Sequence, residues 1–345
     1  MDLNVQKIQF INREYCTLMP KEFVYLHCLS YRNKYPDADW KYIAEKEPFN
    51  EDTTTETVTS EFVKSVNDTV EVSRRCKLLT FVKDWQATYG EHLEGIEVYP
   101  NFTVEVVNIS NATTPLPDLS VVWEINRIAP QMCGMLFENI ISHCLGISDD
   151  VSDLTESLCE FSENVTSLVI EGILCRNFIS REYLVRGDKI DIGDVIKIGS
   201  ERLTEKHFVS KWHYLMFVSL KHFMKRGLDG SAVEDCLNVL DYIKTHIEDM
   251  EKYYYQMNAT TLLRVMRKEK FEHGLMFRRA DLHGEIDFIS DETILDIKCY
   301  RSAAGSGCQG DWFGQLWLYE QLAGERKKKW IVNVYSNKLY KFTKA

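Results

Sequence analysis

The chain has 345 residues, of which 45% are hydrophobic, and its formal net charge at pH 7 is -11. This length allows a full hydrophobic core and either two domains or one elaborated domain. No apolar run approaches the roughly 20 residues that cross a bilayer, and the first residues do not form a signal peptide, so we expect an intracellular protein without a membrane partner. The ten cysteines are scattered singly with no Cys-x-x-Cys pair, which argues against a zinc ribbon or a thioredoxin-like site.

The charge is distributed unevenly along the chain. Residues 261–345 contain 15 Lys and Arg against 11 Asp and Glu, a net charge of +4, which leaves -15 for residues 1–260. A protein of this acidity does not hold nucleic acid by bulk charge alone, because phosphate contacts need local Lys and Arg side chains. The basic surplus coincides with the segment that carries the candidate site.

The N-terminal part shows helical and strand-like patterns but no recognisable chemistry. Periodicity predicts a helix over about 70–88 and strands at 96–99 and 103–108. The proline-containing run 111–117 then interrupts the chain. We therefore predict an N-terminal accessory domain of unknown role over residues 1–125.

The remaining residues, 126–345, are predicted to form a second domain. After Pro130, an apolar stripe at helical spacing predicts a helix that carries Gly134 and Glu138 about one turn apart. Further along, the capping box at residues 231–234 opens another long predicted helix.

Two short apolar segments near the C-terminus each carry an aspartate. Asp287 and Asp296 lie on either side of a polar turn, which predicts a β-hairpin with both acids at one end of the sheet. Because side chains alternate along a strand, Asp296 and Lys298 share a face, with the Ile297 carbonyl between them as a further oxygen ligand. Buried acids and amines are costly unless they are paired or bound to metal, so this group predicts a divalent-metal and water-activating site.

A helix with Gln315 and Tyr319 one turn apart is predicted after this hairpin. The C-terminal segment resembles the PD-(D/E)XK nuclease superfamily, and more closely its RecB-like branch, which includes lambda-type and viral alkaline exonucleases. The branch has the pattern Gly-x-x-Asp, then (Asp/Glu)-x-Lys, then Gln-x-x-x-Tyr. The matching residues, in order, are Gly284 and Asp287, Asp296 and Lys298, and Gln315 and Tyr319.

The resemblance implies an α/β fold with a restriction-endonuclease-like core, in which helices flank a mixed central β-sheet. It also implies that Asp287, Asp296 and the Ile297 carbonyl bind Mg²⁺, or alternatively Mn²⁺, and that Glu138 completes the ligands. Lys298 would orient or deprotonate the attacking water and offset charge on the phosphate.

The family also has an acidic residue on a helix that precedes the hairpin, and the sequence offers more than one candidate for it. The 148 residues between Glu138 and Asp287 exceed what a compact core needs, which implies a helical insertion at about 150–260 or a different source for the acid. Glu272 is the reserve candidate, because a helix nearer the hairpin would need no large insertion. Glu138 could also be an ordinary solvent-facing helix residue.

Other residues are candidates for binding the substrate. Gln315 and Tyr319 would position the substrate strand, although they could equally lie at the edge of an apolar helix packed on the sheet. Arg278 and Arg279 could meet phosphates, with a solvated face as the alternative. Some relatives use four cysteines for an iron–sulfur cluster, but only two lie near this core, so we expect no cluster.

The leading functional hypothesis is therefore a Mg²⁺-dependent deoxyribonuclease, a DNA exonuclease in repair, recombination or genome processing. DNA is favoured over RNA only by analogy with the RecB-like branch. One alternative is an endonuclease that cleaves RNA or branched DNA with the same site. Another is a catalytically silent nuclease fold that binds nucleic acid or protein.

Overall fold

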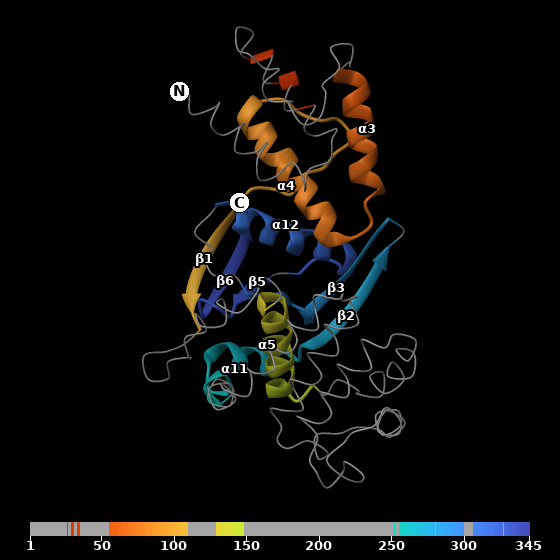
Figure 1. The fold of residues 1–345 in the computed structure, drawn as a ribbon. Coiled ribbons are helices and arrows are strands. Elements are labelled where there is room, and N and C mark those ends of the chain that lie inside the picture. The colour runs from red at the N-terminus through yellow and green to blue at the C-terminus, as the bar shows by residue number, and fades with distance from the viewer. Residues whose placement is uncertain are drawn as a thin grey trace, which may run out of the picture.

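The computed structural model describes residues 55–109, 129–147, 255–279, 281–299, 306–326 and 328–345, together with a few isolated positions. Figure 1 shows the arrangement of the helices and strands in this part of the chain. In chain order they are α3 (Thr55–Asp68), α4 (Val72–Tyr89), β1 (Phe102–Asn108), α5 (Ala129–Leu145), α11 (Thr261–Glu269), β2 (Glu272–Arg279), β3 (Leu282–Ile289), β4 (Thr293–Lys298), α12 (Ser306–Ala323), β5 (Lys328–Asn333) and β6 (Lys338–Lys344).

The strands form one six-stranded sheet in the order β1-β6-β5-β4-β3-β2. β4 and β5 run parallel, and the other neighbouring strands are antiparallel. Parallel neighbours need a crossover connection, and α12 lies in the connection between β4 and β5. The predicted α/β class, with a mixed sheet flanked by helices, is confirmed at this level.

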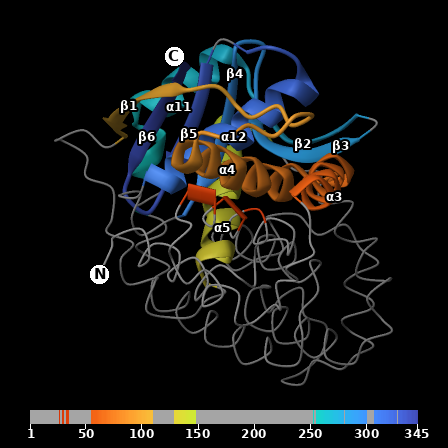
Figure 2. The same cartoon turned by 90° about the horizontal axis from the view of Figure 1, so that it is seen from above.

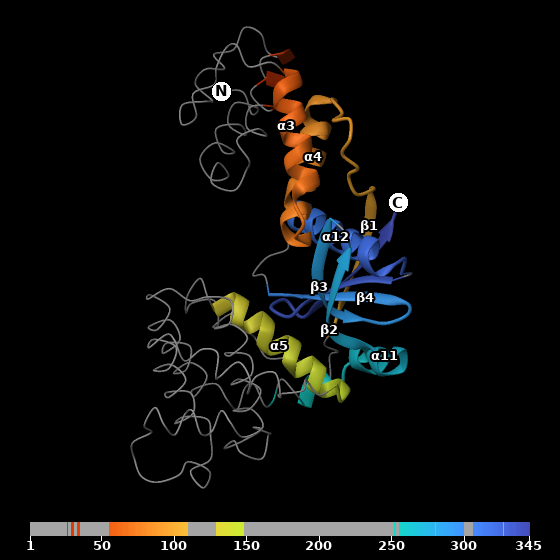
Figure 3. The ribbon, with the colours of Figure 1, turned by 90° about the vertical axis from the view of Figure 1, so that its right-hand side faces the viewer.

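Helices cover both faces of the sheet. α3, α4 and α12 lie on one side, and α5 and α11 lie on the other (Figure 3). Seen from above, α4 crosses the sheet on the α12 side (Figure 2). The core on this side is rich in large apolar side chains, each of which contributes about 1.5–3 kcal/mol when fully buried. Its members include Phe62, Val82, Trp85, Ile286, Ile294, Phe313, Leu316 and Ile331.

Several predicted elements are confirmed. The helix expected over about 70–88 is α4, the strand expected at 103–108 is β1, and the helix expected after Pro130 is α5. α12 ends before Gly324, whose φ of 89° lies in the left-handed region that glycine adopts without strain.

The expected strand at 96–99 is wrong, because these residues have irregular backbone. Lys83 Nζ donates to the Tyr99 carbonyl at 2.8 Å, so a side chain rather than a neighbouring strand satisfies this acceptor. The Tyr99 ring lies against two glycines of α12, where a Cβ at Gly314 would be only 2.7 Å from Tyr99 Cε1 and one at Gly310 would be 3.0 Å from the hydroxyl. Tyr99 therefore anchors an irregular segment to α12.

The described residues of the expected accessory domain share the sheet and core of the C-terminal part. β1 pairs with β6 from Phe102–Lys344 to Asn108–Lys338. α4 belongs to the same buried cluster as α12. The boundary near 125 therefore does not divide the described residues into two cores, and the domain division of the whole chain stays a prediction. Most of the predicted insertion at 150–260 lies outside the described residues.

In the part of the chain that the structure describes, no helix is long and apolar enough to span a bilayer.

Candidate active site

Asp287 and Asp296 lie where β3 and β4 separate. The described pairing of these strands joins Phe288 with Leu295 and Ile289 with Ile294. On the side away from the turn, the next residue of each strand beyond the Phe288–Leu295 pair is an aspartate, Asp287 on β3 and Asp296 on β4. The Ile297 backbone N–H donates instead to Asp287 Oδ2, at 2.6 Å. The Asp287 carboxylate therefore lies between β3 and β4, at a level where a regular ladder would have backbone hydrogen bonds between the two strands.

Asp296 and Lys298 form a close ion pair on β4. Lys298 Nζ lies 2.6 Å from Asp296 Oδ2, and their side chains are 18% and 2% exposed. An aspartate so deeply buried needs a compensating charge, and the ammonium supplies one. The prediction that these two residues share a face is confirmed by this contact.

Gln315 and Tyr319 complete this side of the site from α12. Gln315 Nε2 donates to the Tyr319 hydroxyl at 2.8 Å and lies 3.4 Å from Asp296 Oδ1, a longer and weaker contact. Burial, followed by the charges of Asp296 and Asp287, raises the pKa of Tyr319 well above its usual value, so the phenol stays protonated. Gln315 therefore links the helix to the acidic strand.

Three carboxyl groups, those of Asp287, Asp296 and Glu138, interact with each other around a single lysine. Burial raises the pKa of Asp287 well above its usual range, and the charges of Asp296 and Glu138 raise it further against the effects of Lys298 and the Ile297 N–H. Burial also raises the pKa of Asp296, an effect that Lys298 opposes and Glu138 reinforces. A bound cation would relieve this mutual repulsion.

Glu138 approaches the aspartates from α5, on the other side of the sheet. α5 packs close to the end of β4, where a Cβ at Gly134 would lie 4.0 Å from Cys299 Cβ. Glu138 lies close enough for its charge to act on both Asp287 and Asp296, while its Oε1 lies 2.9 Å from His273 Nε2. The structure thus brings Glu138 near the hairpin acids but directs one of its oxygens to a histidine.

The donor set suits a hard divalent cation, because carboxylate and carbonyl oxygens are the ligands that Mg²⁺ and Mn²⁺ prefer. Asp287, Asp296, Glu138 and the Ile297 carbonyl could provide such ligands. Among the described residues, however, no group of three or more His, Cys, Asp and Glu side chains is arranged to hold a metal ion. The chemistry of the donors therefore fits a metal, whereas their arrangement is not that of a preformed three-residue site.

Glu272 differs from its expected setting. It is exposed and begins β2, and the preceding helix α11 already ends at Glu269. The reserve hypothesis, which needed this acid on a nearby helix, is wrong about that position.

Arg278 and Arg279 lie away from the aspartates, near the turn between β2 and β3. Arg279 pairs with Leu282, which is five residues before Asp287 and so about 16 Å along the strand. Arg279 Nη1 donates to the Gln321 carbonyl at 2.8 Å. The two arginines are therefore not part of the acidic group.

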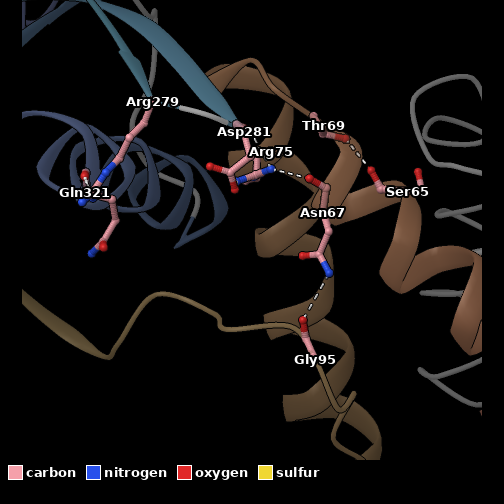
Figure 4. Close-up of polar contacts among 8 residues, drawn as sticks. All are labelled: Ser65, Asn67, Thr69, Arg75, Gly95, Arg279, Asp281 and Gln321. Carbon is pink, nitrogen blue, oxygen red and sulfur yellow. Dashed lines mark hydrogen bonds and ion pairs between the residues drawn. The ribbon is translucent and has the colours of Figure 1, made fainter.

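Arg279 instead lines a pocket of about 400 Å³. Figure 4 shows the polar contacts among several of its lining residues and their neighbours. Arg75 Nη2 donates to the Asn67 carbonyl at 2.7 Å and to the Asp281 carbonyl at 3.0 Å, which ties α4 to the β2–β3 turn. The acids Glu97 and Asp281 offset the two arginines that line this pocket. We therefore assign it no anion-binding role.

Two further residues near the site were not predicted. His273 contacts Glu138 across 135 positions of sequence, a separation that no spacing rule reveals. Asp311 precedes Gln315 by four residues on α12, and burial raises its pKa, while Lys298 is among the charges that act on it. The spacing of Asp311, Gln315 and Tyr319 by one helical turn each is visible in the sequence and could have revealed Asp311.

One cysteine beside the site is not suited to be a thiolate ligand. Cys299 directly follows the β4 lysine, and burial raises the pKa of its thiol to about 12. At neutral pH it is therefore a protonated, partly buried side chain.

No protein-family model matches the chain, and no curated protein or solved structure matches it significantly. A functional assignment therefore depends on the geometry of the site.

Proposed function

We propose that this protein is a divalent-metal-dependent nuclease that hydrolyses phosphodiester bonds, with DNA ends as its leading substrate. The observation that supports the proposal most directly is the arrangement of Asp287, Asp296 and Lys298 at the point where β3 and β4 separate. Buried carboxylates with raised pKa values beside one amine are common at functional sites and costly elsewhere.

The proposed roles follow from these contacts. Asp287, Asp296, the Ile297 carbonyl and Glu138 would hold Mg²⁺ or Mn²⁺. When bound, the cation would polarise the phosphate and lower the pKa of a coordinated water. The Ile297 N–H fixes one oxygen of Asp287 and so restricts the rotation of that carboxylate.

Lys298 and the α12 side chains would act on the substrate. The Lys298 ammonium, held by Asp296 at 2.6 Å, would orient the attacking water and offset negative charge that develops on the phosphate. Gln315, fixed between Tyr319 and Asp296, would contact the substrate strand beside the scissile bond. Arg278 would contact a phosphate further along the strand, whereas Arg279 is engaged by the Gln321 carbonyl and is left out of this proposal.

The decisive experiment offers the protein end-labelled linear duplex DNA, closed circular DNA and single-stranded RNA with Mg²⁺, Mn²⁺ or chelator. Metal-dependent loss of linear DNA alone would support a DNA exonuclease. Cleavage of circles or RNA would support the endonuclease alternative. If the protein binds one of these nucleic acids but cleaves none of them with Mg²⁺, Mn²⁺ or chelator, the proposal is contradicted and the silent binding module is supported.

Lys298→Ala should abolish cleavage while the protein remains folded, and Lys329→Ala is its matched control. Lys329 Nζ also forms a close ion pair, 2.8 Å from Glu320 Oε1, and its side chain is 12% exposed against 18% for Lys298. Both variants lose a partly buried lysine from the sheet, but only one loses the amine at the site. Equal activity in the two variants would remove Lys298 from the mechanism.

A further inference from the structure

We propose that His273 is a positioning residue that holds the Glu138 carboxylate in place for the divalent cation. This inference rests on the proposed function and adds a residue that the sequence motifs do not contain. It concerns the orientation of Glu138, not a direct contact between His273 and the substrate.

The imidazole of His273 is fixed on several sides. Its side chain is only 7% exposed, and Nε2 lies 2.9 Å from Glu138 Oε1. Its ring lies 4.8 Å from the Phe288 ring, centroid to centroid, and His273 pairs with Phe288 across β2 and β3. A histidine held in this way can keep one carboxylate oxygen in a single position, because a carboxylate accepts the hydrogen that the ring nitrogen donates.

The backbone beside His273 departs from a regular strand. Gly274 has a φ of 63°, and the pairing of β2 with β3 includes residues on either side of Gly274 and Asp287 but not that pair. The irregular position, Gly274, therefore follows His273 on β2 and stands opposite Asp287 on β3. Glycine permits this conformation, which most other residues adopt only with strain.

The remaining oxygen of Glu138 is the one available to a cation. Glu138 is 21% exposed, and its charge acts on both Asp287 and Asp296. The Glu138 carboxylate therefore has His273 on one side and the hairpin aspartates within electrostatic range. Residues that hydrogen-bond to metal ligands commonly change metal affinity by about 10- to 100-fold when they are replaced.

The test compares His273→Phe with His273→Gln. Phenylalanine keeps a ring against Phe288 but cannot donate to Glu138, whereas glutamine keeps an N–H donor on a side chain of suitable length. We would measure Mn²⁺ binding by calorimetry, the Mg²⁺ dependence of cleavage and the thermal unfolding of the metal-free variants. We expect His273→Phe to weaken metal binding about tenfold or more, and His273→Gln to retain most of the affinity.

A double variant separates positioning from a general effect on the fold. In a Glu138→Gln background, His273→Phe should weaken metal binding little further, because the carboxylate that it positions is already absent. Equal metal affinity of His273→Phe and the original protein would overturn the inference while the proposed function stands. The same holds if the two substitutions have independent, additive effects. Absence of metal binding by the original protein would instead refute the proposed function, and this inference with it.

Discussion

Gly284 lies directly against the ring of Tyr319. A Cβ at Gly284 would be 3.0 Å from Tyr319 Cε1 and 2.9 Å from Val72 Cγ2, closer than side-chain packing tolerates. The absent side chain of Gly284 therefore lets both α4 and α12 approach β3. In this way Gly284, three residues before Asp287, sets the position of Tyr319, which lies one helical turn after Gln315.

Gly284→Ala should destabilise the protein by about 1–3 kcal/mol, because the added methyl group forces Tyr319 or Val72 to move. Chemical denaturation measures this change. Gly134→Ala is the matched control, since the nearest atom to its Cβ is 4.0 Å away and alanine favours a helix interior. Similar losses of stability in the two variants would contradict the proposed packing at Gly284.

The local parts of the site could be predicted from the sequence. Asp287, Asp296 and Lys298 lie within twelve consecutive residues, and a polar turn fixes their hairpin, so the alternation of side chains already places the ion pair. Gln315 and Tyr319 are likewise neighbours by helical spacing alone.

The long-range parts could not be predicted in the same way. The pattern of β1 predicts a strand, but its pairing with β6 joins residues more than 200 positions apart. The contact between Glu138 and His273 depends on how α5 and the sheet pack together, not on either local sequence. A local pattern can also mislead. The alternation at residues 96–99 predicts a strand, but this segment is irregular, and the ring of Tyr99 packs on α12.

Asp287→Asn should stabilise the metal-free protein at neutral pH, by on the order of 1 kcal/mol. The pKa of Asp287 is raised in the folded state, so this group destabilises the fold increasingly as the pH rises above its unfolded pKa of about 3.9. In the original protein the destabilisation by Asp287 therefore becomes smaller as the pH falls toward the unfolded pKa of about 3.9. The asparagine variant should lack this part of the pH dependence of stability.

Thermal unfolding at several pH values, in the presence of chelator, measures the effect of Asp287→Asn. The asparagine carbonyl can still accept the Ile297 N–H, so the main change is the loss of charge. A variant that is less stable than the original protein at neutral pH would show that the Asp287 charge is already compensated in the fold. Cleavage should be lost in the same variant.

Glu269→Gln should cost about 1–3 kcal/mol at neutral pH, because it disrupts a partly buried hydrogen-bonding group at the β3–β4 turn. Glu269 Oε2 accepts from Thr293 Oγ1 at 2.6 Å, and Oε1 accepts from Lys328 Nζ. Burial tends to raise the pKa of Glu269, but hydrogen bonds from Lys328, Thr293 and Ser290 outweigh it, and the pKa is lowered.

A lowered folded-state pKa stabilises the fold above the unfolded value of about 4.3, and this stabilisation is lost as the pH falls through the folded pKa. The difference between Glu269→Gln and the original protein should therefore shrink in acid below about pH 4. Glu292→Gln is the control, because Glu292 pairs with the same Lys328 at 3.1 Å but is 48% exposed, and it should change stability by less than about 1 kcal/mol. Equal effects of the two substitutions at neutral pH would contradict the assigned role of Glu269.

The contribution of the hydrogen bond between Gln315 and Tyr319 to the free energy of unfolding can be measured without any assumption about activity. Tyr319→Phe removes the hydroxyl that accepts from Gln315 Nε2 at 2.8 Å, and Gln315→Leu removes the donor. If the bond contributes about 1 kcal/mol, unfolding of the two single variants and the double variant should show a coupling of that size. Additive effects would mean that the two side chains are merely adjacent. A measurable coupling would instead show that Tyr319 restricts Gln315, and cleavage by Tyr319→Phe should then be impaired even though the Asp296–Lys298 pair is intact.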